Sequence, residues 1–191
     1  RQEYDDWAIS AYHRYGLSDA LTLGVRGEAE AGLYNLGTTG VMRSSRWGIM
    51  SGAISLSDGK ENSGWAGSAG YVYRDKDFHL QGALRRYSSG YGIVGRLGTD
   101  ERPEQEVMAS TGYGVKGFGS FGLSFHQLTQ YQGSNRKLAS LTYSHTLYRR
   151  FNLMAAVSRT VTGDEGSTGF YVGLNYHPGS SLNTSLRHQQ D

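Results

Sequence analysis

Short runs in which hydrophobic and polar residues alternate fill most of this chain. Phe121, Leu141 and Leu174, for example, each lie between two polar or glycine neighbours. Side chains of a β-strand point alternately to the two faces of its sheet, so a period of two predicts strands with one apolar and one polar face. A helix is disfavoured, because glycines such as Gly48 and Gly52 recur inside the runs and each costs about 1 kcal/mol in a helix.

Twelve runs of this kind lie between turn signals. They cover about 7–14, 20–28, 34–43, 47–57, 65–74, 78–87, 106–113, 118–130, 137–146, 151–161, 168–177 and 181–188. Tight turns rich in glycine, serine and aspartate are expected to alternate strictly with longer, polar links. The longest link, about 88–104, contains Pro103, which is expected outside any sheet because it lacks a backbone donor.

Strands with one apolar face, joined alternately by short turns and longer loops, predict an all-β, antiparallel transmembrane β-barrel of about twelve strands in the bacterial outer membrane. In such a wall, apolar side chains contact lipid and polar side chains line a hydrated lumen. The predicted lipid-facing residues are Phe121, Leu123, Phe125, Leu141, Tyr143, Leu153, Val157, Phe170, Val172 and Leu174. The predicted lumen-facing residues are Arg26, Glu28, His79, Gln81, Arg85, Ser124, His126, Asn152 and Asn175.

Composition agrees with a thin β-wall. Only 37% of the 191 residues are hydrophobic, which is little for a soluble core. Disorder is disfavoured because the net charge is only +2 and 12% of residues are aromatic. No basic stripe marks a nucleic-acid partner. The chain has no cysteine, which excludes disulfides and thiolate metal sites. No run reaches the 18 apolar residues typical of a membrane helix.

No catalytic or metal-binding pattern emerges from the sequence. The six histidines are scattered without metal-ligand spacing, and no serine lies in a nucleophile elbow. Gly112, Gly114 and Gly117 fit a Gly-x-Gly-x-x-Gly pattern, but they fall in a predicted hairpin turn with no following helix. The sequence therefore predicts no enzyme, no cofactor and no metal. An outer-membrane lipase or protease would need an ordered Ser/His or Asp/His pair in the wall, and none is evident.

Three segments together resemble the fimbrial outer-membrane usher of the chaperone–usher pilus pathway. They are Tyr-Gly-Leu-Ser-Asp-Ala-Leu-Thr-Leu at 15–23, the glycine-spaced hairpin at 34–57, and Arg-Tyr-Ser-Ser-Gly-Tyr at 86–91. They occur in the family's order, and the resemblance is strongest between Tyr12 and Tyr91. It implies the part of a larger usher barrel that follows the plug domain, acting as a channel that exports and assembles pilus subunits.

The same resemblance implies the partners. These are pilus subunits and the periplasmic chaperone that delivers them, outer-membrane lipid, and the remaining usher domains or strands. Residues 1–191 are accordingly expected to be a single barrel segment, a fragment without plug or periplasmic domains. Two other interpretations stay open: a stand-alone, porin-like outer-membrane barrel that passes small solutes, and a soluble sandwich in which the aromatic residues fill a core.

Overall fold

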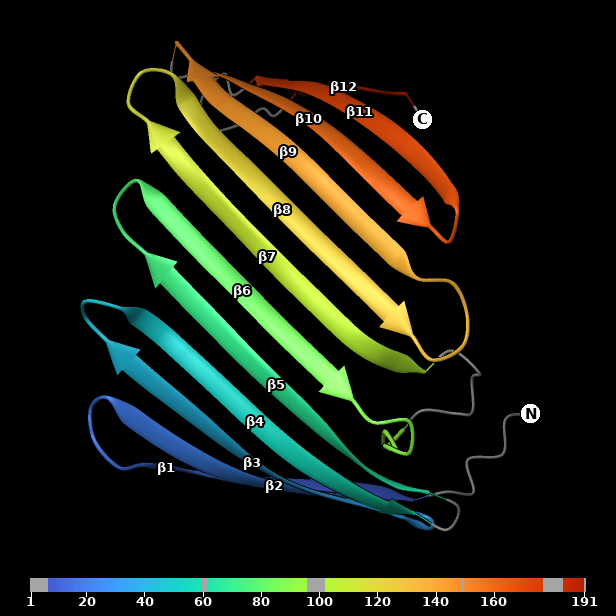
Figure 1. Cartoon of the computed structure of the whole chain (residues 1–191). Helices are drawn as coiled ribbons and strands as arrows, with labels where there is room; N and C mark the ends of the chain where they lie inside the picture. Colours follow the sequence, from blue (N-terminus) through green and yellow to red (C-terminus); the bar gives the residue numbers. More distant parts are fainter. Residues whose placement is uncertain (1–6, 60–61, 96–101, 149, 177–183, 191) are drawn as a thin grey trace. The chain divides into compact units, whose positions relative to one another are not determined.

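The computed structural model describes residues 7–59, 62–95, 102–148, 150–176 and 184–190. They form twelve β-strands in one sheet, arranged in the order of the sequence from β1 to β12 (Figure 1). The strands are β1 Ala8–Gly16, β2 Leu21–Glu30, β3 Leu33–Ser44, β4 Gly48–Gly59, β5 Ser63–Arg74, β6 Phe78–Tyr87, β7 Pro103–Val115, β8 Gly119–Gln130, β9 Arg136–Leu147, β10 Phe151–Thr162, β11 Glu165–Tyr176 and β12 Thr184–Gln190. The predicted all-β, antiparallel fold is confirmed. The strand order is open, with β1 at one end and β12 at the other.

The chain divides into two compact units. The first comprises residues 1–73, 83–107 and 128–133, and the second comprises residues 74–82, 108–127 and 134–191. Strands β1 to β4 lie wholly in the first unit, and strands β9 to β12 lie wholly in the second. Within the described residues, no helix has the length and apolar character needed to cross a membrane.

The prediction that Pro103 lies outside the sheet is wrong, because β7 begins at this residue. Proline lacks a backbone N–H, but the first residue of a strand is one of the places where a sheet tolerates it. The strand also takes in Glu104, which was expected in the preceding link. The link between β6 and β7 is therefore shorter than predicted.

Strict alternation of short and long links is also wrong. The links after β2 and β10 were expected to be longer loops, but they consist of residues 31–32 and 163–164. Gly32 and Gly163 adopt positive φ angles of 82° and 59°, a conformation that suits tight hairpin turns. The error arose at Ala29 and Glu30, which were assigned to a loop but pair with Tyr34 and Leu33. The predicted turn at residues 178–180 lies outside the described residues.

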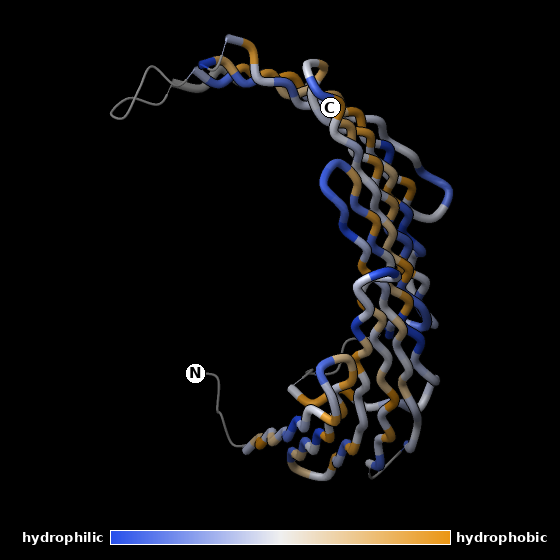
Figure 2. The backbone as a smooth tube through the Cα atoms, turned by 90° about the vertical axis from the view of Figure 1, so that its left-hand side faces the viewer, coloured by the Kyte–Doolittle hydropathy of each residue, from blue (hydrophilic) through white to orange (hydrophobic). Residues whose placement is uncertain are grey.

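The sheet has no hydrophobic core among its described residues. No apolar side chain there is buried, and large hydrophobic side chains are exposed instead, including Leu36 at 67% and Phe170 at 59%. Hydrophobic and hydrophilic residues alternate along the strands (Figure 2). So much exposed apolar surface needs an apolar partner or environment to cover it. A soluble sandwich with an aromatic core does not have this pattern.

Candidate functional site

In the first unit, strand register separates an apolar face from a polar face. Residues directly opposite each other in an antiparallel pair share a face. In the β3–β4 pair, Leu36 lies opposite Leu56, whereas Asn35 lies opposite Ser57. The face of Leu36 carries exposed apolar side chains across β1 to β5: Ile9, Leu23, Val25, Tyr34, Met42, Met50, Ile54, Leu56 and Trp65. The opposite face is built largely from glycine, alanine, serine, threonine and asparagine, together with charged side chains and the exposed Tyr12, Val41, Ile49 and Val72.

In the second unit, all ten residues predicted to face lipid share one face of the sheet. Register places Leu153 opposite Leu174 and Val157 opposite Phe170. Tyr143 lies opposite Ala155 on the same face, and its ring lies 5.0 Å from that of Phe121 on β8. The remaining members follow from these by the strand period of two: Leu123, Phe125, Leu141 and Val172. That this shared face contacts lipid stays a prediction.

Six of the predicted lumen residues belong to the opposite face of the second unit. Ser124 and Ser140 share a hydrogen bond of 2.6 Å between β8 and β9, and His126 follows Ser124 by two residues. Asn152 lies opposite Asn175. The Oδ1 atom of Asn152 is buried without a hydrogen-bond partner.

His79 and Gln81 belong to the same face of the second unit. A Cβ added at Gly112 would lie 2.1 Å from the His79 ring, so this ring covers Gly112. A Cβ added at Gly114, two residues further along β7, would contact Ser120 at 3.6 Å. Ser120 lies on the same face as Ser124, so Gly114 and Gly112 on β7 also belong to that face. His79, which covers Gly112, therefore belongs to it as well. Gln81 follows His79 by two residues on β6 and shares its face.

The other three predicted lumen residues belong to the first unit and form ion pairs. Arg26 pairs with Glu28 along β2, and Arg85 on β6 pairs with Glu106 on β7 at 2.9 Å. Both arginine side chains are about half exposed, so each pair contributes little stability, about 0–1 kcal/mol. Within the described part of the chain, no three His, Asp or Glu side chains gather as metal ligands.

The polar face of the first unit carries a docked loop. This loop, residues 88–95, follows β6 and is named the seated loop. Its centre is held by Gly92, whose N–H donates to Ser57 Oγ at 3.0 Å and whose carbonyl accepts from Asn35 Nδ2 at 3.1 Å. Asn35 and Ser57 are only 5% and 3% exposed, and they are the buried polar residues of the described chain. The seated loop is the contact that buries them.

Further hydrogen bonds hold the seated loop on both sides of its centre. The Tyr91 hydroxyl donates to Ser55 Oγ at 3.1 Å, and the Gly95 N–H donates to Glu30 Oε2 at 2.7 Å. The acceptors come from β4 and β2, so the loop spans several strands. At its start, Ser88 forms two hydrogen bonds of 2.8 Å with the backbone of Trp65 on β5.

Three glycines allow the seated loop to approach the sheet closely. A Cβ at Gly64 on β5 would lie 2.3 Å from the backbone nitrogen of Tyr91, and one at Gly90 would lie 2.2 Å from the Ser63 carbonyl oxygen. One at Gly92 would lie 2.5 Å from the Leu33 side chain. Contacts to backbone atoms under 3.0 Å cannot be relieved by a rotamer change, so side chains at Gly64 and Gly90 are incompatible with docking.

The sequence did not reveal that the seated loop docks on these residues. The segment at residues 86–91 was singled out only as part of a family resemblance, and Asn35, Ser55 and Ser57 looked like ordinary wall positions. Their partners lie 35 to 57 residues away in the chain, and no local pattern reports such contacts. The available signal was the density of glycine and serine at residues 88–92, which permits close approach to other backbone but is also common in ordinary turns.

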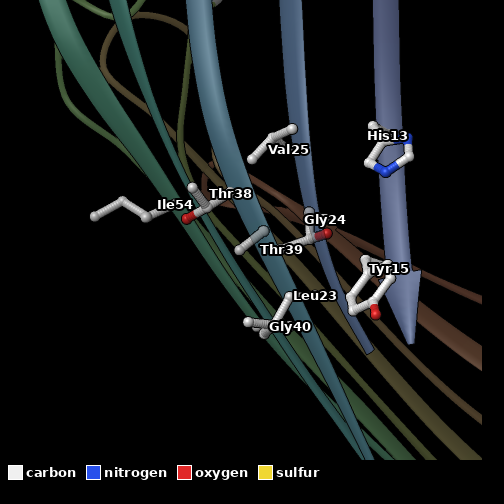
Figure 3. Close-up of a pocket in the computed structure, with 11 residues that line it drawn as sticks. His13, Tyr15, Leu23, Gly24, Val25, Thr38, Thr39, Gly40 and Ile54 are labelled. Atoms are coloured by element: carbon white, nitrogen blue, oxygen red, sulfur yellow. The ribbon is translucent and has the colours of Figure 1, made fainter. Parts of the chain in front are cut away.

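The apolar face of the first unit contains a depression of about 490 Å³ (Figure 3). It forms where Gly40 and Gly52 lie opposite each other without side chains. Its rim includes Leu23, Val25 and Ile54, and no carboxylate, lysine or arginine lines it. The depression is therefore a gap in a largely apolar surface, and His13 and Tyr15 are the titratable side chains among its lining residues.

These features define a class of fold: an antiparallel sheet with an exposed apolar face and a polar face, as in the wall of an outer-membrane β-barrel. Sequence comparison matches the chain to no family model and to no curated protein. Among solved structures, the chain is similar to the P pilus usher (PapC) translocation pore, with a TM-score of 0.69 and 14% sequence identity. The match covers 96% of this chain and 41% of that chain, so this chain spans less than half the length of its structural neighbour. At this identity the likeness shows the fold.

Proposed function

We propose that the chain forms part of the wall of an outer-membrane, usher-type channel that exports and assembles chaperone-delivered pilus subunits. The observation that carries this proposal is the two-faced sheet without a buried apolar core, combined with its similarity to an usher pore. Lipid would cover the exposed apolar face, and the polar face would line the passage.

The proposed channel is not an enzyme. In the usher family that the sequence resembles, folding and pairing of the subunits supply the energy for export, so the channel wall needs no hydrolytic site. The polar face supports this role because it carries both signs of charge and many small hydroxyl side chains. Such a surface binds a passing polypeptide weakly enough to release it. The proposed partners are pilus subunits, their periplasmic chaperone, outer-membrane lipid and the remaining parts of an usher.

A second candidate function is a stand-alone, porin-like channel for small solutes. The seated loop favours it, since chain lying on a polar face would leave less room for a folded subunit than for a solute. The two functions predict different phenotypes for the deletion of the encoding gene.

We expect deletion to abolish surface pili and to leave the uptake of small solutes unchanged, and complementation with the full chain to restore the pili. Piliation is measured by electron microscopy of intact cells, and uptake by the entry rate of a hydrophilic antibiotic. Normal piliation combined with reduced uptake would support the porin-like function and reject the usher function. Normal values of both would reject each of them.

A further inference from the structure

The seated loop (residues 88–95) occupies the face of the sheet that would line the passage. The residues on which it docks are part of the strands themselves. Asn35 and Ser57, which bond Gly92 of the loop, are both buried, and Gly64 leaves space that the loop backbone fills. A loop held by chance would not need a glycine in the strand beneath it. The docked position is therefore a defined state of the molecule.

The base of the seated loop is held separately from its centre. Ser88 is bonded to the Trp65 backbone on β5, and the Tyr131 hydroxyl donates to the Tyr87 carbonyl at 2.7 Å. Arg102, beyond the loop, also donates to the Ser89 carbonyl at 3.2 Å. The segment that contains Gly92 can thus leave the sheet while the start of the loop stays attached.

The contacts at the loop centre are of a kind that water can replace. Gly92 is held through small hydroxyl and amide groups, Ser57 Oγ and Asn35 Nδ2. In addition, Asn35 Oδ1 is buried without a partner while the loop is docked. Release of the loop would expose this acceptor to water, which removes an unfavourable contribution to the docked state.

We infer that the seated loop is the constriction of the channel: docked on Asn35 and Ser57 it narrows the passage, and when it leaves the sheet the passage widens. This inference rests on the proposed function, because it needs the polar face to line a channel. It identifies a regulatory element that belongs to the wall itself.

Single-channel conductance of the assembled channel that contains the full chain, measured in planar lipid bilayers, tests this inference. Two kinds of variant release the loop: Gly90→Val, which places a side chain against the Ser63 carbonyl, and Asn35→Ala combined with Ser57→Ala, which removes both bonds to Gly92. Both are expected to increase conductance. Gly16→Val is the matched control, since a Cβ there meets nothing within 4 Å, and it should leave conductance unchanged.

A disulfide lock separates loop release from damage to the fold. Ser57→Cys with Gly92→Cys adds the only two cysteines of the chain at positions joined by a 3.0 Å hydrogen bond. The nearest atoms to the Cβ added at Gly92 belong to the end of the Leu33 side chain, which must shift to accommodate it. In the Asn35→Ala background, oxidation should restore the parent conductance, and reduction should raise it again. The rate at which this pair cross-links reports docking independently, and it should fall in the Gly90→Val background.

The outcomes separate the two proposals. Slower cross-linking without any change in conductance would show that the loop leaves its seat and does not constrict the passage, which overturns the inference alone. Absence of any channel activity from the assembled channel that contains the full chain would instead overturn the proposed function. Unchanged cross-linking of the cysteine pair in both the Gly90→Val and the Asn35→Ala backgrounds would show that the described contacts do not hold the loop, which also overturns the inference.

Discussion

Substitution of Leu141 by arginine is expected to lower the free energy of unfolding in lipid vesicles by about 2–4 kcal/mol, the cost of arginine at the bilayer midplane on the lipid face of a barrel. Leu141 is 49% exposed on the apolar face of β9, so the loss cannot come from a disrupted core. Leu153→Arg on β10 should behave alike if this position is also near the midplane. The measurement is urea-induced unfolding of the full chain, followed by tryptophan fluorescence.

The neighbouring residue provides a matched control. Thr142 is also exposed, but it lies on the opposite face, where arginine would project into water. Thr142→Arg should therefore cost much less than Leu141→Arg, apart from the loss of its 3.4 Å hydrogen bond to the Gly122 carbonyl. Ser140→Arg tests the same face. Equal losses for the substitutions on the two faces would contradict the assignment of the apolar face to lipid.

The second large effect is expected at Gly119, where β8 begins. Its φ angle is +98°, and an added Cβ would lie 2.2 Å from the Ser144 carbonyl oxygen on β9. Gly119→Ala therefore combines backbone strain with a clash against the neighbouring strand, and we expect a loss of more than about 2 kcal/mol of unfolding free energy. Unfolding in lipid vesicles measures this loss.

Gly117, two residues earlier in the same turn, separates the two causes. It has a φ angle of +82°, but an added Cβ would meet nothing within 4 Å. Gly117→Ala should therefore show the strain alone, about 1–2 kcal/mol. If Gly119→Ala is no more damaging than Gly117→Ala, the close approach of β8 to β9 at this point is not a constraint on the fold.

The strands and their faces could be predicted because both depend on local pattern. Alternation such as Ser140, Leu141, Thr142 predicts a strand and its two faces at once. The register of β9 with β10, and of β10 with β11, then places the apolar positions of the three strands opposite one another. The residues near the strand ends were harder. Glu30 is polar and was assigned to a loop, yet it lies two residues after Glu28 on the same face of β2, and a polar residue at every second position is what one face of such a sheet requires.

The seated loop could not be predicted, for a different reason. Its hydrogen bonds join residues that are distant in sequence, as between Asn35 and Gly92, and each partner is a residue type common in any polar wall. Pro103 shows a related limit. Its missing N–H excludes it from the interior of a sheet, but whether a strand starts at that residue depends on its neighbour strands.

Accessibility of spin labels in lipid vesicles tests most directly whether one face of the sheet contacts lipid and the other water. The chain has no cysteine, so single cysteines can be introduced and labelled without background. The scan covers six consecutive positions of β9, from Ala139 to Ser144. Collisions with oxygen, which concentrates in lipid, should be frequent at Ala139, Leu141 and Tyr143, and collisions with a water-soluble nickel complex should be frequent at Ser140, Thr142 and Ser144. Equal accessibility to both reagents along the strand, or the reverse alternation, would contradict the account.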